Sequence, residues 1–360
     1  MKELSNRSAN FTDSVIRRMT RVANKYGAVN LSQGFPDFDP PKEITDRLRE
    51  IAPHGPHQYA LTWGAQNFRE ALARKHEHFS GMKVDPNKEI VVTCGSTEAM
   101  MASMLTVCNP GDKVVVFSPF YENYGADTIL SGAEPIYVPL VPPEFHFDKE
   151  KLEDAFRQGA KALILCNPSN PCGKVFTMEE MQTIAELAKK YDAYVVTDEV
   201  YEHIVYAPNK HIYMQSLEGM RERTIVCNSL SKTYSITGWR LGYVIANPQI
   251  IDRVKKVHDF LTVGAAAPLM EAAVVGLEFG DGYYDELAAH YAHMKEVFVG
   301  GLKKLGLKYT DPQGAYYVLV DVSEFGVKDD VKFCEWMAQF VGVAAVPGSS
   351  FFREDVHNLV

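Results

Sequence analysis

The chain has 360 residues, 46% of them hydrophobic, so it is long enough to bury a large core in about two structural units. Its 46 acidic and 37 basic residues are scattered and give a net charge of -9, which argues against nucleic acid as a partner. The six cysteines form no C-x-x-C pair, and the N-terminal stretch lacks the apolar segment of a secretory signal. Since no stretch reaches the roughly 20 apolar residues of a membrane span, we expect a cytoplasmic protein with reduced thiols and no membrane contact.

Through the middle of the chain, short runs rich in Val, Ile and Leu alternate with longer segments of helical periodicity, which is typical of a parallel sheet covered by helices. The expected strands are residues 89–93, 113–117, 161–166, 193–197, 224–227 and 241–246. The expected crossover helices are residues 96–107, 121–130, 178–191 and 250–261. The third helix should begin with a capping box, because Thr177 is followed three residues later by Glu180.

After about Gly264 the alternation weakens, and three helical stretches surround the apolar run GAYYVLVDV at residues 314–322. These helices are expected at 268–277, 284–305 and 331–340. We therefore predict an α/β protein with a mostly parallel, helix-covered sheet in a large domain and a smaller α+β domain. The predicted division is an N-terminal arm that joins the small domain (1–45), the large domain (46–268) and the C-terminal small domain (269–360).

The segment with the clearest chemistry is SLSKTYSITGWRLG at residues 229–242. Lys232 offers an amine that condenses with an aldehyde, and its small hydroxyl neighbours leave room for a flat ring. Ser229 adds a hydroxyl, and Arg240 adds a guanidinium suited to phosphate oxygens. An isolated S-x-S-K would more often be a surface lysine, whereas the whole string is far more specific.

This string resembles the cofactor-lysine signature of the class I pyridoxal-phosphate aminotransferases, which have fold type I. NPSNPCG at residues 167–173 and TDEVY at 197–201 resemble two more motifs of that family, in the same order. The resemblance implies the fold of that family, pyridoxal 5'-phosphate as the cofactor, and Lys232 as the catalytic residue that carries it as a Schiff base and moves the substrate's Cα proton.

Asp198 follows the apolar run AYVV and should therefore lie at the carboxyl end of a central strand, where open α/β sheets bind ligands. A carboxylate there would keep the pyridine nitrogen protonated, although such an Asp alone is more often a helix cap or a surface charge. By resemblance, Asn170 and Tyr201 would hydrogen-bond the ring oxygen of the cofactor, and Asn170 would also contact the substrate. The bond between Asn170 and Pro171 is a candidate for the cis form.

The cofactor phosphate has a second candidate site, because EIVVTCGST at residues 89–97 passes from a strand through Gly95 into a helix. Helix N-termini present free amides to anions, and simple N-capping by Ser96 or Thr97 is the alternative. By resemblance, Gly95, Ser96 and Thr97 would bind the phosphate together with Ser229 and Arg240. Tyr121 matches the aromatic residue that stacks on the pyridine ring, although a core tyrosine is an equally good interpretation of that residue alone.

Two other segments concern subunit contacts and substrate. Tyr59 resembles the tyrosine that reaches the phosphate site of a neighbouring subunit, which implies a homodimer. LSQGFPDFDPP at residues 31–41 makes Gly34 the candidate for backbone contact with the substrate carboxylate. This segment and KVHDFLT at 256–262 are most similar to the kynurenine and methionine aminotransferases, which implies aromatic, sulfur-containing or glutamine-like L-amino acids as substrates.

The family's substrate-carboxylate arginine follows a stretch that VHNLV at residues 356–360 resembles, and the sequence ends there. We expect the natural protein to continue, and we expect Arg353 to be a surface residue that does not replace this arginine. The histidine pairs His76 and His78, and His290 and His293, should be exposed on helices and bind no metal.

The predicted reaction is ping-pong transfer of an amino group from an L-amino acid to a 2-oxo acid such as 2-oxoglutarate. A carbon–sulfur β-lyase on the same fold is the closest alternative, because sequence separates the two poorly. A non-catalytic regulator is a third, and the lack of a basic helix-turn-helix extension argues against it.

Overall fold

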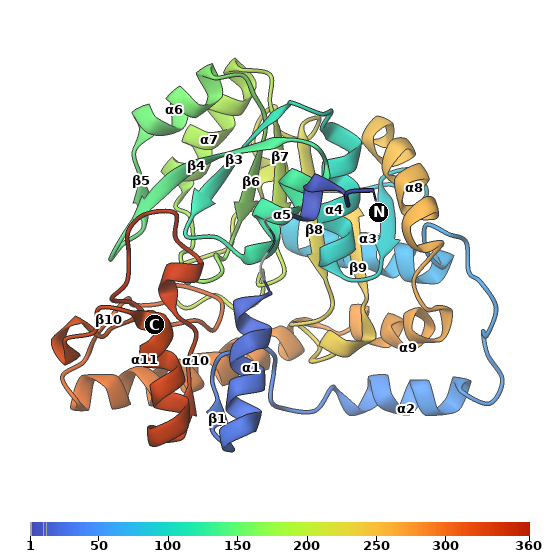
Figure 1. Cartoon of the computed structure of the whole chain (residues 1–360). Helices are drawn as coiled ribbons and strands as arrows, with labels where there is room; N and C mark the ends of the chain where they lie inside the picture. The colour runs from blue at the N-terminus through green and yellow to red at the C-terminus, as the bar shows by residue number, and fades with distance from the viewer. Residues whose placement is uncertain (1, 10, 12) are drawn as a thin grey trace.

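The computed structural model describes residues 2–9, 11 and 13–360, and its centre is an eight-stranded sheet (Figure 1). The order across the sheet is β2-β9-β8-β7-β6-β3-β4-β5. The strands are β2 (Ile90–Thr93), β3 (Lys113–Ser118), β4 (Glu134–Val141), β5 (His146–Phe147), β6 (Ala160–Cys166), β7 (Tyr194–Asp198), β8 (Thr224–Ser229) and β9 (Gly242–Ile245). Five neighbouring strands, from β8 to β4, are parallel, while β9 runs antiparallel to both of its neighbours and β5 antiparallel to β4. The predicted α/β fold with a mostly parallel sheet is confirmed.

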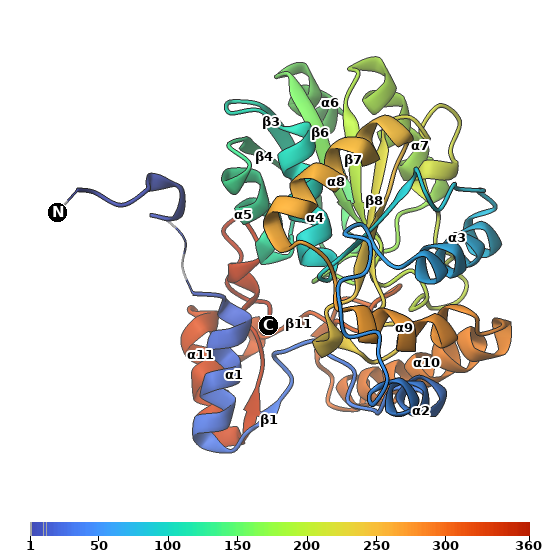
Figure 2. The same cartoon turned by 90° about the vertical axis from the view of Figure 1, so that its right-hand side faces the viewer.

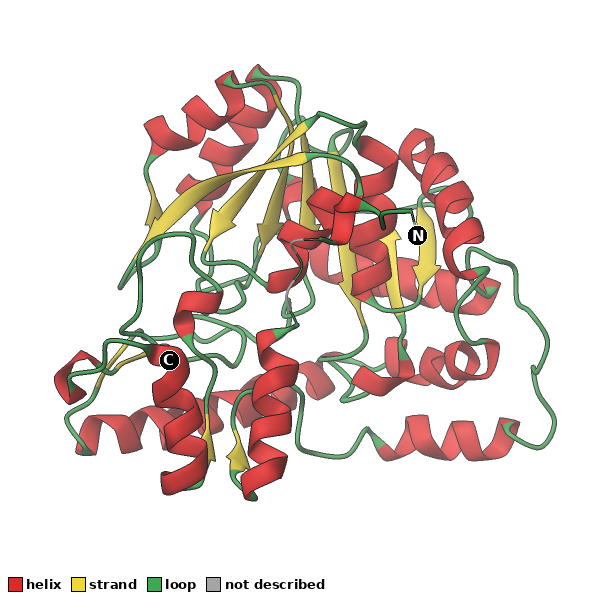
Figure 3. Ribbon diagram, viewed as in Figure 1, coloured by secondary structure: helices red, strands yellow, loops and turns green. Residues whose placement is uncertain are grey.

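Helices cover both faces of this sheet (Figure 3), and the side chains of β3 alternate between the two resulting cores. Val115 and Phe117 pack in the core that includes α6 and α7, whereas Val114 and Val116 pack in the core that includes α4, α5 and α8. These helices are α4 (Ser96–Val107), α5 (Glu122–Leu130), α6 (Lys149–Arg157), α7 (Met178–Lys190) and α8 (Pro248–Thr262). Burial on both faces explains why the central strands are almost continuously apolar.

Residues 15–30 and 330–344, from the two end regions of the chain, lie together below the sheet. Strand β1 (Val29–Asn30) pairs in parallel with β12 (Val343–Ala344), and α1 (Val15–Tyr26) stands beside α11 (Asp330–Trp336) in both views (Figures 1 and 2). The remaining elements are α2 (Lys42–Ile51), α3 (Gln66–Ser80), α9 (Ala267–Leu277), α10 (Asp281–Lys304), β10 (Lys308–Tyr309), β11 (Val320–Asp321), a π-helical turn (Met337–Val341) and five short 3-10 turns (Asn6–Ser8, Met214–Ser216, Thr237–Trp239, Ser323–Phe325 and Gly348–Ser350). At the C-terminal end, Val360 and Val320 exchange two backbone hydrogen bonds of 2.8 and 3.0 Å. The division into residues 1–45, 46–268 and 269–360 stays a prediction.

Strand β4 and His76 differ from the sequence-based expectations for reasons that the structure shows. Strand β4 was not predicted, because Pro135 and Pro139 interrupt its apolar pattern. The prolines are tolerated because β4 lies near the sheet edge and β5 pairs only with the last residues of β4. The expectation that His76 is exposed is wrong, since it is 7% exposed and packs edge-on against the ring of Tyr213. Within the described part of the chain, no helix has the length and apolar character that crossing a bilayer requires.

The predicted capping box at the start of α7 is confirmed. The hydroxyl of Thr177 accepts a hydrogen bond from the Glu180 amide at 3.2 Å, and the Glu180 carboxylate accepts one from the Thr177 amide at 2.9 Å. We expect Thr177→Ala to lower the free energy of unfolding by about 1 kcal/mol, measured by chemical denaturation. The matched control is Glu186→Ala, an exposed position within the same helix, which should change it by less than about 0.5 kcal/mol. Equal effects of the two changes would contradict this account.

Candidate active site

The candidate residues come together because several strands end at one edge of the sheet. Strands β3, β6, β7 and β8 are parallel, and the register aligns Cys166, Asp198 and Cys227 near their carboxyl ends. Strand β2 points the same way, since it is antiparallel to β9 and β9 is antiparallel to β8. The segments that leave this edge therefore carry the predicted ligand-binding side chains, as is usual for an open α/β sheet.

Lys232 lies in the segment after β8, and its Nζ donates a hydrogen bond of 2.8 Å to the carbonyl oxygen of Gly34. Burial lowers the pKa of this amine to about 8; the Asp198 carboxylate acts in the opposite direction, and Arg240 adds to the lowering. Compared with an ordinary lysine, Lys232 therefore has a much larger fraction of neutral, nucleophilic amine near neutral pH.

Asp198 is the last residue of β7 and is only 8% exposed. The hydroxyl of Tyr124 donates to Oδ2 at 2.8 Å, and the Val200 amide donates to Oδ1 at 3.3 Å. Burial raises the pKa of Asp198 to about 6, while the hydrogen bond from Tyr124 opposes that rise. A positively charged ring nitrogen beside this carboxylate would stabilise its ionised form.

The start of α4 is the candidate phosphate site. Its N-cap is Gly95, which has a φ of 82° and no side chain. The amides of the first turn therefore receive no hydrogen bond from an N-cap side chain and are available to an anion. A Cβ atom on Gly95 would overlap the Arg240 guanidinium, which places that cation directly against the turn. The alternative that Ser96 or Thr97 caps the helix is wrong, because both residues lie inside the first turn.

Gly34, Asn170 and Tyr201 meet around a residue that was not predicted. The Tyr317 hydroxyl oxygen lies 2.7 Å from that of Tyr201 and accepts from Asn170 Nδ2 at 3.4 Å. A Cβ atom on Gly34 would overlap the same hydroxyl. The bond between Asn170 and Pro171 is cis.

Three other predicted residues, Tyr121, Ser229 and Tyr59, lie outside the group formed by Gly34, Asn170, Tyr201 and Tyr317. Tyr121 is half-buried directly before α5, and its ring meets the Tyr124 ring edge-on at 5.7 Å. Ser229 is buried at the end of β8, where its Oγ accepts from the Ser231 amide at 3.4 Å. Tyr59 is 87% exposed, so the structure of a single chain does not bring it into this group.

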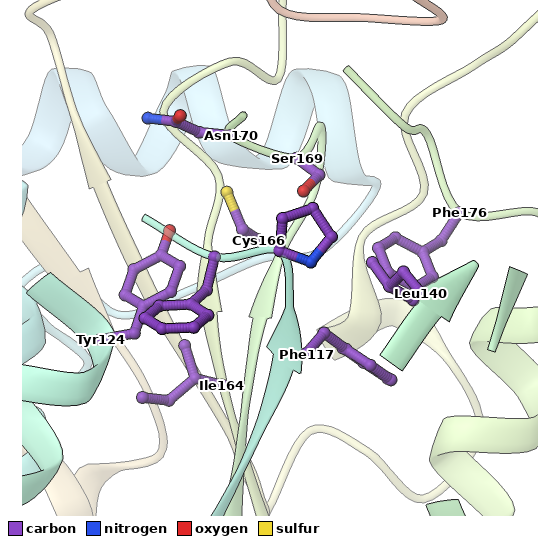
Figure 4. A pocket seen from close by; sticks show the side chains of 10 residues that line it. Phe117, Tyr124, Leu140, Ile164, Cys166, Ser169, Asn170 and Phe176 are labelled. Atoms are coloured by element: carbon purple, nitrogen blue, oxygen red, sulfur yellow. The ribbon is translucent and has the colours of Figure 1, made fainter. Parts of the chain in front are cut away.

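Figure 4 shows a narrow cavity beside the site, between β3, β6 and the turn that carries Asn170. Its lining includes Phe117, Tyr124, Ile164 and Cys166, and its volume is about 10 Å³. This is room for about one water molecule and far too little for an amino acid, so the cavity is part of the packing beneath the site.

Sequence reasoning missed Tyr124 and Tyr317. Tyr124 had a weak signal, because it lies three residues after Tyr121 and so shares its helix face. Tyr317 was visible only as part of an apolar run. Arg353 is exposed as predicted, with its guanidinium 5.2 and 4.6 Å from the ring centres of Phe120 and Tyr137.

Comparison with known proteins decides the family. Residues 26–354 match the family described as aminotransferase class I and II. The chain belongs to this family. This aminotransferase is 34% identical over 348 residues to the methionine aminotransferase of Escherichia coli, covering 96% of this chain and 90% of that protein. It is 33% identical over 363 residues to human kynurenine--oxoglutarate transaminase 3, covering 93% of this chain and 80% of that protein.

Solved structures give the same result for the fold. N-succinyldiaminopimelate aminotransferase from Mycobacterium tuberculosis superposes with a TM-score of 0.96 at 32% identity, over 99% of this chain and 94% of that one. Class I and II aminotransferases use pyridoxal phosphate. The groups at the sheet edge fit that cofactor chemically: an amine for its aldehyde, a buried carboxylate for its ring nitrogen, and a guanidinium at a helix N-terminus for its phosphate.

The contact between Gly95 and Arg240 gives a test of the phosphate site. Gly95→Ala would force the guanidinium away from the helix N-terminus, and the loss of one charged hydrogen bond corresponds to about tenfold weaker binding or more. We therefore expect the dissociation constant of pyridoxal phosphate to rise by about tenfold or more, as measured by fluorescence titration of the cofactor-free protein. The control is Gly111→Ala, which has the same unusual backbone (φ 87°) but open space around its Cβ position. Equal affinities of the two variants would contradict the assignment.

Proposed function

We propose that this aminotransferase moves the amino group of an aromatic, methionine-like or glutamine-like L-amino acid to a 2-oxo acid such as 2-oxoglutarate, in a ping-pong sequence. The observation that carries this proposal is the partly buried amine of Lys232, which donates to the Gly34 carbonyl. Burial lowers the pKa of this amine, Asp198 opposes the lowering, and Arg240 adds to it. An amine of this kind accepts and returns protons near neutral pH.

Each residue has a distinct task in this proposal. Pyridoxal phosphate, when bound, supplies an aldehyde that bonds amines and a ring that takes up the electron pair left when a Cα proton departs. Arg240 and the amides after Gly95 would bind the phosphate, with Ser229 nearby, and Asp198 would hold a proton on the ring nitrogen. Asn170 and Tyr201 would bind the ring oxygen. Lys232 Nζ would take the Cα proton of the substrate and return it one carbon away.

The proposed substrate class rests on the aromatic surroundings of Lys232. Its Nζ lies 5.6 Å from the ring centre of Tyr316, and the rings of Tyr201, Tyr316 and Tyr317 pack on one another. Such surfaces favour flat or apolar side chains over a second carboxylate. The names of the relatives agree in part, since two of them are named for methionine and kynurenine.

We also propose a homodimer in which Tyr59 reaches the phosphate site of the neighbouring subunit. Two apolar segments support this. Tyr59 and Leu61 are 87% and 50% exposed, and Phe260 at the end of α8 is 92% exposed. The two segments are connected, because His258 on α8 hydrogen-bonds the carbonyl oxygen of Thr62 at 2.7 Å. Exposed apolar residues clustered in this way are typical of subunit contacts.

The pKa of Lys232 predicts how cofactor uptake depends on pH. Only the neutral amine attacks an aldehyde, and this form becomes predominant as the pH rises through about 8. We therefore expect the rate at which the cofactor-free protein incorporates pyridoxal phosphate to rise through that pH and then level off, as followed by absorbance in a stopped-flow instrument. A rate that still rises steeply toward pH 10 would contradict the lowered pKa.

Substitution of Lys232 tests the function itself. We expect Lys232→Ala to abolish amino transfer to 2-oxoglutarate, at least a thousandfold, because the positioned base is lost. The control is Lys256→Ala on the exposed face of α8, which should keep full activity. Activity retained by Lys232→Ala would contradict the proposal.

The same assay resolves the substrate and the alternative reaction. A panel of methionine, kynurenine, phenylalanine, glutamine, aspartate and N-succinyldiaminopimelate should show the highest turnover for one of the first four. A cysteine conjugate added to the panel distinguishes amino transfer from β-elimination, because only elimination releases pyruvate and ammonia. Preference for a dicarboxylate or for elimination would contradict the proposed function.

A further inference from the structure

The Tyr317 hydroxyl lies at the centre of the candidate site although it comes from a segment distant in sequence. It is 2.7 Å from the Tyr201 hydroxyl and 3.4 Å from Asn170 Nδ2, and it lies against Gly34, whose carbonyl accepts from Lys232. No motif assigned Tyr317 a role. It thus contacts three of the residues proposed to bind cofactor or substrate.

Backbone hydrogen bonds fix the segment that carries Tyr317. The amides of Gln313 and Gly314 donate to the Gly173 carbonyl at 2.8 and 2.9 Å, and the Ala315 amide donates to the Ile204 carbonyl at 2.8 Å. A Cβ atom on Gly314 would overlap the side chain of Pro168, so a larger residue does not fit. The segment is therefore clamped between the turn that carries Asn170 and the loop that carries Tyr201.

The three polar groups are placed to form a directed chain, in which Asn170 donates to Tyr317 and Tyr317 donates to Tyr201. Burial raises the pKa of both Tyr201 and Tyr317, so both hydroxyls keep their protons. Asn170 Nδ2 can only donate, and it donates to the Tyr317 oxygen. The Tyr317 proton is then available for the Tyr201 oxygen, which leaves the Tyr201 proton for a group outside the chain. Successive hydrogen bonds of this kind polarise and strengthen one another.

We infer that Tyr317 is a positioning residue that makes Tyr201 a directed hydrogen-bond donor toward the ring oxygen of the cofactor. This inference rests on the proposed function, in which Tyr201 binds that oxygen. A stronger donor takes up more of the negative charge on the oxygen. That charge then attracts the proton on the Lys232 nitrogen less strongly, so the nitrogen loses its proton at lower pH.

The test is a pH titration of the bound cofactor's visible absorbance, without substrate. Tyr317→Phe removes one oxygen atom and should raise the midpoint by about half a pH unit, the size of one neutral hydrogen bond. Tyr201→Phe should raise it further. In the double variant the midpoint should equal that of Tyr201→Phe alone, because Tyr317 acts through Tyr201.

The matched control is Tyr291→Phe. Tyr291 is buried and stacks on Tyr316, and its hydroxyl has no hydrogen-bond partner among the described residues. This change should leave the midpoint unmoved, and thermal unfolding of all variants without cofactor verifies that each is folded.

Two results would overturn the inference: an unchanged midpoint in Tyr317→Phe, or shifts that add fully in the double variant. If the unchanged midpoint comes with a raised KM, Tyr317 is a substrate contact instead. The proposed function fails separately, if the unsubstituted protein shows no cofactor titration or if Lys232→Ala remains active.

Discussion

The carboxylate of Asp198 is buried at the end of a central strand, and a buried charge is costly without an opposite charge beside it. Its hydrogen-bond donors, Tyr124 and the Val200 amide, are both neutral, so burial still raises its pKa. The same burial lowers the pKa of Lys232. Each group is thus pushed toward its neutral form, and a ligand with a cationic ring nitrogen relieves the carboxylate. In the proposed function, the sheet edge is thereby prepared for such a ring before the ring binds.

A second buried pair lies behind the first turn of α4, the proposed phosphate site. Glu98 in the first turn of α4 accepts from His258 Nδ1 at 2.6 Å and from the Thr262 hydroxyl at 2.7 Å. His258 Nε2 faces the Thr62 carbonyl at 2.7 Å, so both ring nitrogens must donate and the imidazole is charged. Burial acts against that charge, yet Glu98 raises the pKa of His258 above its ordinary value. The pair joins α4, α8 and the loop after Tyr59.

Features that depend on residues close together in the sequence could be predicted, and features that depend on contacts between distant residues could not. All six predicted strands begin within one residue of the observed start, and five of them also end within one residue of the observed end. Helix α4 matches at both ends, because apolar runs and helix signals are local. Lys232, Asp198 and Arg240 were proposed as site residues from motifs, and their roles stay predictions. Tyr124 and Tyr317 were not, because their roles arise from contacts across 74 and 116 residues of chain. His76 was placed wrongly for the same reason, since its burial depends on a distant loop.

A further carboxylate, that of Glu202, holds the segments that make these distant contacts in fixed positions. Asp198 at the end of β7 and Tyr201 just after it face the candidate site, whereas Glu202 faces a buried network. Glu202 accepts from Lys75 at 2.7 Å, from Asn228 at 3.0 Å and from Tyr213 at 2.8 Å. Asn228 in turn accepts from the Ser229 amide at 2.7 Å. Because removing one partner of such a network leaves a buried charge unpaired, the ends of β7 and β8 are held in one arrangement. The relative positions of Tyr201 and Lys232 follow from that arrangement.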